Sequence, residues 1–181
     1  MNTLFILKNR ENKTLNIEKT LEKISSFSDY ISRWIAIPCL GFYTILTFVG
    51  VLSRFVFKHP IAEAIELSRV GFVWSCLMGS AVAYKRHKHI EFTAITSHLP
   101  FRTRNVIGTI VSTLTLVFII WVLVYSISIT IKVWPSKLSA SGISNGFLYL
   151  PLPIALVVML THNILDIYKS IVAIVAGERV S

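Results

Sequence analysis

The sequence predicts an all-α membrane protein with four transmembrane helices and an N-terminal amphipathic helix at the membrane interface. Of its 181 residues, 54% are hydrophobic and only 15% are charged, and the mean hydropathy of +0.66 is high for a chain with a solvated surface. Aspartate, glutamate, lysine and arginine are absent from four windows, at residues 34–53, 70–84, 105–131 and 138–165. These windows make up about half of the chain, which excludes a large soluble catalytic domain.

The N-terminal segment, residues 1–33, is polar and basic. Residues 15–34 place apolar side chains at mostly three- and four-residue steps, which is the pattern of an amphipathic helix. We expect this helix to lie along the cytoplasmic membrane interface, with its lysines near anionic lipid headgroups. The predicted apolar face of this amphipathic helix consists of Leu21, Ile24, Phe27, Ile31 and Trp34. The alternative is that the segment is a plain N-terminal extension of the first transmembrane helix.

Residues 34–167 form the predicted transmembrane domain, and residues 168–181 a cytoplasmic tail. A helix needs roughly 20 apolar residues to cross the hydrocarbon core, and three of the windows provide them. The second window has 15 uncharged residues. It can still span the membrane if Glu66, Arg69 and Lys85 lie at its ends, because long basic side chains reach the interface.

The fourth window begins with a predicted loop. It contains Gly142, Gly146, Pro151 and Pro153. Because proline is accepted in the first turn of a helix and disrupts its interior, we expect the regular helix to start near one of the two prolines.

Lysine and arginine are distributed unequally between the two sides of this topology. Thirteen lie in the N-terminal segment, the loop between the second and third spans and the C-terminus, whereas five lie in the other two loops. The positive-inside rule therefore places both termini in the cytoplasm. The cations border the apolar windows instead of forming one basic face with interleaved aromatic rings, so we expect no nucleic-acid partner.

The second span carries small residues at four-residue intervals. Gly71, Ser75, Gly79 and Ala83 lie on one stripe of that helix. In lipid there is little hydrophobic drive between helices, so close backbone approach over small side chains supplies the contact. We predict that this stripe packs against another helix, in this chain or in a partner subunit. The alternative is that the four-residue spacing of these small residues arises by chance, because the span is rich in glycine and alanine.

Four charged residues border the predicted loop between the first two spans: Arg54, Glu63, Glu66 and Arg69. Glu66 and Arg69 are three residues apart and share a helix face. We predict an outer charge cluster that fixes this loop or docks a partner on the outer face. The alternative is that each charge reaches water independently.

The sequence offers no motif for catalysis or cofactor binding. The four windows hold no acidic or basic side chain apart from histidine, and we expect the five histidines to lie near span ends or in loops. Haem would need two inward histidines at one depth on facing helices, whereas His162 has Asp166 four residues away as its predicted partner. No phosphate-binding loop, zinc motif, CxxC pair or nucleophile elbow is present. We therefore expect no enzyme activity, no cofactor and no metal.

Short motifs follow one another in a characteristic order through residues 30–170. They are Arg54-Phe55-Val56-Phe57, Glu66-Leu67, Arg69, Trp74, Gly79-Ser80-Ala81, His89-Ile90 and Leu99-Pro100. The series resembles the small, DctQ-like membrane subunit of the tripartite ATP-independent periplasmic (TRAP) transporters. Two departures concern Ala64 and Ile65, where the family often has an acidic residue or tryptophan, and Thr93, where it often has aspartate.

The resemblance implies an accessory subunit in a bacterial inner membrane. In TRAP systems a large membrane subunit carries sodium and substrate by an elevator-like movement, a soluble periplasmic protein captures an organic anion, and the small subunit braces the scaffold. The implied substrates are carboxylates, such as sialic acids or dicarboxylates, and no residue of this chain is expected to contact them. Two other readings remain, a membrane anchor of a quinone- or haem-linked redox complex and a small self-sufficient exporter.

Overall fold

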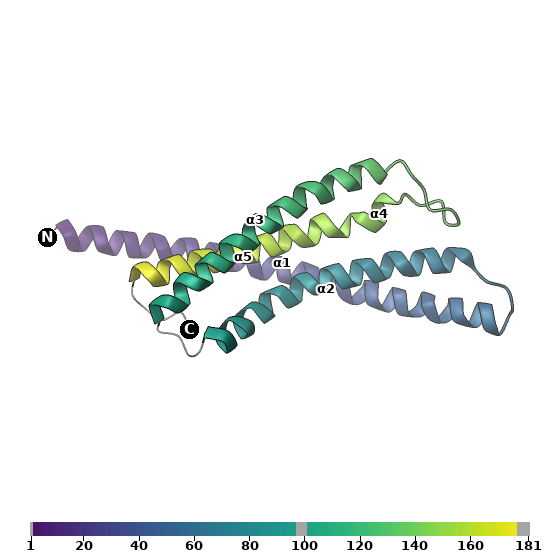
Figure 1. The fold of residues 1–181 in the computed structure, drawn as a ribbon, viewed down its shortest axis with the longest axis horizontal. Helices are drawn as coiled ribbons and strands as arrows, with labels where there is room; N and C mark the ends of the chain where they lie inside the picture. Colours follow the sequence, from purple (N-terminus) through teal and green to yellow (C-terminus); the bar gives the residue numbers. More distant parts are fainter. Residues whose placement is uncertain (1, 97–100, 177–181) are drawn as a thin grey trace.

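The computed structural model describes the backbone of residues 2–96 and 101–176, and the side chains of residues 19–86 and 106–172. Four long helices run side by side (Figure 1). The α1–α2 connection and the loop between α3 and α4 lie at one end of the molecule, and the N-terminal end of α1 lies at the other. The helices are α1 (Asn2–Phe55), α2 (Ala62–Thr96), α3 (Phe101–Val133), the short α4 (Gly146–Tyr149) and α5 (Pro151–Ala176).

The structure confirms the four predicted transmembrane helices. Among the residues whose side chains are described, four segments are long and apolar enough to cross a membrane: Lys19–Phe55, Ala62–Arg86, Val106–Val133 and Gly146–Val172. The last regular helix begins at Pro151, one of the two prolines expected to start it. Residues 168–176, assigned from the sequence to a tail, continue this helix, and residues 177–181 lie outside the described part of the chain.

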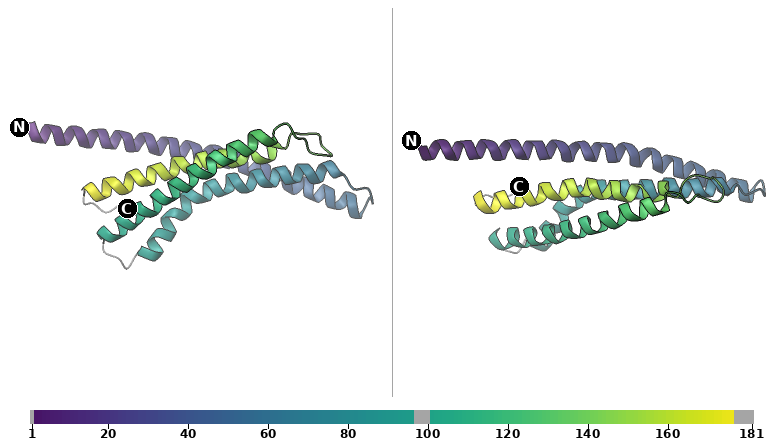
Figure 2. Two further views of the ribbon diagram at one scale, coloured as in Figure 1. Left: turned by 45° about the horizontal axis from the view of Figure 1, so that its top comes forward. Right: turned by 90° about the horizontal axis from the view of Figure 1, so that it is seen from above.

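The N-terminal amphipathic segment and the first span form one helix of 54 residues. Both views in Figure 2 show α1 extending beyond the other helices without a break. The structure therefore matches the alternative of an N-terminal extension, rather than a separate helix lying along the interface. The reason is local, because residues 1–37 contain neither glycine nor proline to end a helix. The first such residue is Pro38, which lies inside α1.

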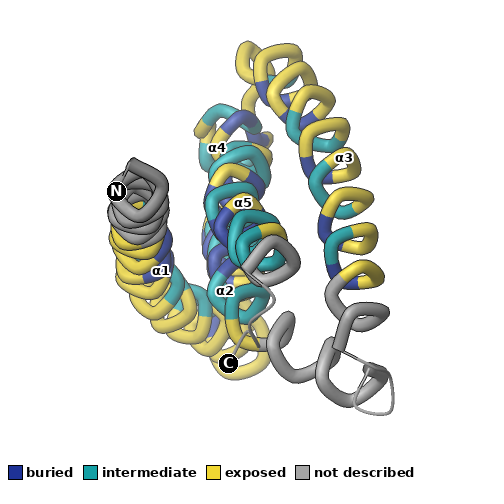
Figure 3. The backbone as a smooth tube through the Cα atoms, turned by 90° about the vertical axis from the view of Figure 1, so that its left-hand side faces the viewer, coloured by how far each residue is buried: buried dark blue, intermediate teal, exposed yellow. Residues whose placement is uncertain are grey.

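Helix α5 holds the other long helices together. It contacts α1, α2 and α3, while α1 and α2 form a second extensive pair. Seen end-on, α5 lies between α1 and α3 (Figure 3). The buried apolar core consists of Met78 and Ala81 from α2 with Ala155 and Val158 from α5. Its small residues let the two helices approach, and the flexible methionine fills the remaining space.

Helix α2 approaches α1 closely at Gly71. A Cβ atom at this position would lie 3.1 Å from Phe42 Cδ1 and 3.3 Å from the carbonyl oxygen of Cys39. The rings of Tyr43 and Phe72 meet beside it, with centroids 5.2 Å apart. At Gly79, two turns further along α2, a Cβ atom would meet no heavy atom within 4 Å.

We expect Gly71→Leu to loosen the α1–α2 pair, because the added side chain must displace Phe42 or the α1 backbone. Overpacking of this kind typically costs about 1–3 kcal/mol. Thermal unfolding of the detergent-solubilised chain should show a lower Tm than the parent protein. The matched control is Gly79→Leu, whose side chain enters open space and should leave Tm unchanged. Equal Tm values for the two variants would contradict the assigned contact.

Candidate functional site

The loop between α3 and α4 is fixed to α2 by one carboxylate. Glu66 Oε1 accepts a hydrogen bond from the backbone N–H of Ala140 at 3.0 Å. Glu66 Oε2 accepts from the backbone N–H of Ser141 and from its hydroxyl, both at 2.9 Å. Hydrogen bonds to an ionised acceptor are stronger than neutral ones. Two consecutive residues of the loop are therefore held in one orientation against the first turns of α2.

The loop is itself a tight turn. An isolated antiparallel bridge joins Lys137 to Ser144, and the N–H of Leu138 donates to the carbonyl oxygen of Ile143 at 2.8 Å. Gly142 has a φ of 68°, a left-handed conformation that glycine adopts without a steric penalty. The turn presents the N–H groups of residues 140 and 141 to the carboxylate on α2.

A tryptophan fixes the other end of the same connection. Trp74 Nε1 donates to the carbonyl oxygen of Phe147 at 2.8 Å, which joins α2 to α4. The rings of Trp134 and Phe147 pack with centroids 5.6 Å apart. A Cβ atom at Gly146 would overlap the Trp134 ring, so only glycine fits there. We call Glu66, Trp74 and the loop of residues 134–147 the outer latch.

The structure does not join the four predicted outer charges in ion pairs. Glu66 alone makes the loop contacts just described, and these go to the connection before α5 rather than to the loop between the first two spans. Arg54 lies near the Phe55 ring, 5.8 Å from its centroid, and Glu63 and Arg69 are exposed. Backbone N–H groups are fixed donors, whereas the long arginine side chains extend toward the surface.

The stripe of small residues divides into two halves. Gly71 and Ser75 are buried, while Gly79 and Ala83 are only partly so. Each four-residue step on a helix with 3.6 residues per turn advances the side chain by about 40° beyond a full turn. The stripe therefore turns away from α1 along its length, and Met78 replaces Gly79 in the buried row. Its first half packs within this chain, whereas its second half faces open space at Gly79.

The predicted apolar face of the N-terminal segment points outward. Its members lie on α1, with Leu21 half-buried and the others exposed. Tyr30 packs beside Trp34 on this side, with ring centroids 6.0 Å apart. The face is available to lipid or to a partner. The exposed members are Ile24, Phe27, Ile31 and Trp34.

A buried group of polar side chains joins α5 to α1 and α2, and sequence reasoning missed it. Ser25 Oγ lies 2.7 Å from His162 Nδ1, and Asn163 Nδ2 donates to the Tyr84 hydroxyl at 2.7 Å. The expected pairing of His162 with Asp166 is wrong, because Nδ1 contacts Ser25 and Nε2 has no partner among the described residues.

His162 is 2% exposed and precedes Asp166, the first charged residue after the fourth window, by four residues. Helix α5 continues past the end of that window at residue 165. Within the described residues, no three side chains of histidine, cysteine, aspartate or glutamate are placed to hold a metal ion.

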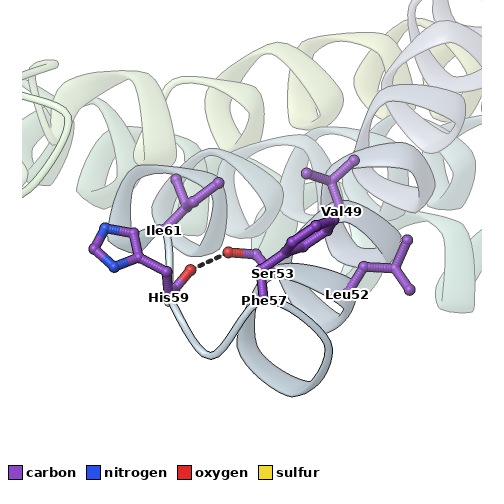
Figure 4. Close-up of a pocket in the computed structure, with 6 residues that line it drawn as sticks. All are labelled: Val49, Leu52, Ser53, Phe57, His59 and Ile61. Carbon is purple, nitrogen blue, oxygen red and sulfur yellow. Dashed lines mark hydrogen bonds between the residues drawn. The ribbon is translucent and has the colours of Figure 1, made fainter.

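Two hollows on the surface are lined mainly by apolar side chains. The one near the α1–α2 connection has a volume of about 370 Å³ (Figure 4). Its Ser53 hydroxyl already donates to the carbonyl oxygen of His59, so the hollow suits apolar groups rather than a charged solute. The other lies on the outward side of α3, beside Trp121 and Tyr125. The first hollow is lined by Val49, Leu52, Ser53, Phe57, His59 and Ile61.

Comparisons with known proteins give a consistent result. The family model described as "Tripartite ATP-independent periplasmic transporters, DctQ component" matches residues 43–173. The C4-dicarboxylate TRAP transporter small permease protein DctQ of Vibrio cholerae is 30% identical over 104 residues, which cover 58% of this chain and 45% of that protein. A putative TRAP transporter small permease protein of Haemophilus influenzae is 26% identical over 128 residues, covering 71% of this chain and 78% of the relative.

A longer protein is also similar. The sialic acid TRAP transporter permease protein SiaT of Haemophilus influenzae is 26% identical over 141 residues, which cover 77% of this chain but only 22% of that protein. The chain thus spans less than half the length of two of these three relatives. The resemblance motifs at His89, Ile90, Leu99 and Pro100, and the departure at Thr93, lie outside the residues whose side chains are described.

We expect Glu66→Ala to release the outer latch, because the N–H groups of residues 140 and 141 lose their shared acceptor. Amide hydrogen exchange across residues 136–145 should accelerate, on the order of ten-fold or more for a locally opened loop. Glu63→Ala is the matched control, since Glu63 is exposed and should leave exchange in the loop unchanged. Unaltered protection of residues 140 and 141 in Glu66→Ala would show that the carboxylate does not hold the loop.

Proposed function

Because the chain belongs to the DctQ component family of the tripartite ATP-independent periplasmic transporters, we propose that it is the small accessory subunit of a sodium-coupled uptake system for organic acids. It braces the scaffold of a large transport subunit in the bacterial inner membrane. The transported substrate is a carboxylate, of the C4-dicarboxylate or sialic acid class named for two of its relatives.

The packing of α2 against α5 carries the bracing proposal. Met78 and Ala81 are fully buried against Ala155 and Val158 at the centre of the bundle. A solute passing through this chain would have to displace these apolar contacts. Outside them, large apolar side chains are exposed along α1 and α3, including Trp34, Phe48 and Trp121. A chain with a closed centre and an apolar exterior suits a support role beside a moving subunit.

The partner proposal rests on the open half of the small-residue stripe and on the length of one relative. Among the described residues, no heavy atom lies within 4 Å of the position that a Cβ atom would take at Gly79. A helix of another subunit can therefore approach α2 there. In the longer sialic acid permease, the part similar to this chain is only 22% of the protein. This proportion supports a large membrane partner for the present chain, as a separate chain or as part of the same one.

The outer latch supplies the proposed contact with a periplasmic substrate-binding protein. The charge distribution favours cytoplasmic termini, which puts the latch on the periplasmic side. Lys132 and Lys137 are exposed near its loop, and Glu66 keeps that loop in one shape. A preformed surface loses less conformational freedom on binding than a flexible one.

The proposal is tested by transport in reconstituted vesicles. Vesicles containing this chain alone should not accumulate a dicarboxylate or a sialic acid against a gradient. Addition of a large TRAP membrane subunit and of a soluble substrate-binding protein should give uptake that depends on a sodium gradient. Concentrative uptake by this chain alone would overturn the proposal.

A second test concerns the assembly of the complex. We expect Gly79→Leu to lower the amount of large subunit that co-purifies with a tagged chain, because a bulky side chain holds the partner helix away from α2. Gly41→Leu is a matched exchange on α1, also in open space, and should leave the complex yield unchanged. If both variants retain the full complex, the Gly79 side of α2 is not the contact.

A further inference from the structure

A row of polar side chains on α1 is buried against α5. Ser25, Asp29 and Ser32 are 1%, 7% and 0% exposed. Their spacing of four and three residues places them on one face of the helix. His162 on α5 is 2% exposed, and its Nδ1 lies 2.7 Å from Ser25 Oγ. The two helices therefore meet through polar groups, which is costly unless each group finds a hydrogen-bond partner.

Two atoms at this meeting point have no partner among the described protein atoms. They are Asp29 Oδ1 and His162 Nε2. The remaining polar atoms are accounted for, since Asp29 Oδ2 accepts from Arg33 and the Ser32 hydroxyl donates to a carbonyl oxygen one turn earlier in α1. Buried polar atoms in folded proteins nearly always bond to protein or to ordered water. These two atoms therefore mark a place for a further hydrogen-bonding group.

We propose that water binds between α1 and α5, where it forms hydrogen bonds with Asp29 Oδ1 and with His162 Nε2. Water has two donors and two acceptors, whereas a carboxylate oxygen only accepts. The imidazole nitrogen donates or accepts according to its tautomer. Water satisfies both atoms in either tautomer, because it donates to Asp29 and can donate to His162 or accept from it.

The surroundings of His162 are polar, as a hydrated site requires. Asn163, the next residue of α5, is fully buried and donates to the Tyr84 hydroxyl of α2. The charges of Lys85 on α2 and of Asp29 and Asp166 on α1 and α5 act on the imidazole. A cavity holds water when polar groups line it and stays dry when apolar groups do. The polar groups around His162 meet the first condition.

A partly exposed ion pair lies on the same two helices, about two turns from the proposed site. It joins Glu22 to Lys169, with an N–O distance of 2.6 Å. Glu22 precedes Asp29 by seven residues, and Lys169 follows His162 by seven, which is about 10.5 Å along a helix axis. In the other direction along α5 lies the apolar core around Met78, which is 0% exposed. We therefore infer that water enters from the ion-pair end and stops at the apolar core.

Hydroxyl-radical labelling of the full-length chain in lipid nanodiscs tests this proposal. Radicals formed from water by a brief X-ray pulse oxidise side chains that contact water, and mass spectrometry locates the oxidised residues. Met78 is an internal reference, because it is as buried as His162 and its thioether is intrinsically more reactive than imidazole. We expect oxidation at His162 to exceed that at Met78 by several-fold. His162 oxidation at or below the level of Met78 would overturn the proposal.

Variants of Asp29 test the second ligand. Asp29→Leu removes the acceptor, so we expect oxidation of His162 to fall several-fold. Asp29→Asn keeps a side-chain oxygen and should retain most of it, so this variant also serves if the leucine variant does not fold. Tyr30→Phe is the control, because this exposed neighbour faces away from α5. Undiminished His162 oxidation in a folded Asp29→Leu chain would exclude the carboxylate as a ligand.

Discussion

The contact of α5 with α1 and α2 is the constraint on which the rest of the fold depends. Lipid removes most of the hydrophobic drive between helices, so close approach and hydrogen bonds must hold them. Two adjacent residues of α5 form such contacts with different helices. His162 contacts Ser25 of α1, and Asn163 donates a hydrogen bond to Tyr84 of α2. One and two turns earlier, Val158 and Ala155 pack on α2. With α5 fixed in this way, α3 has a surface to pack on, and α5 is its main neighbour.

The spans were predictable because bilayer thickness fixes their length and charge marks their ends. The start of α5 followed from the chemistry of Pro151. The course of the N-terminal segment did not follow, because an amphipathic pattern is the same in an interfacial helix and in an extension of a span. The two arrangements differ in whether the helix is interrupted before the first span. Residues 1–37 contain neither glycine nor proline, and α1 runs through Pro38 without ending.

The sequence indicated where candidate residues lie better than it indicated which groups they contact. Glu66 stood out as an acidic residue beside an apolar window, yet its partners are backbone N–H groups 74 and 75 residues away. Every residue except proline offers such a donor, so no sequence pattern could identify them. The burial of the serines on α1 could not be predicted for a related reason. A serine is found on both exposed and buried faces of helices, and only the packing of another helix against it shows that it is buried.

The two sides of the apolar core are stabilised by different chemistry, and the difference fits the proposed bracing role. On the side of the α3–α4 loop, a charged side chain and Trp74 hold backbone groups of one connection. On the other side, polar side chains connect α5 to α1 and α2, and the apolar core separates the two regions. A helix pair joined only at its centre could rock about that point. Contacts on both sides of the core oppose such rocking, which is what the proposed support of a moving partner requires.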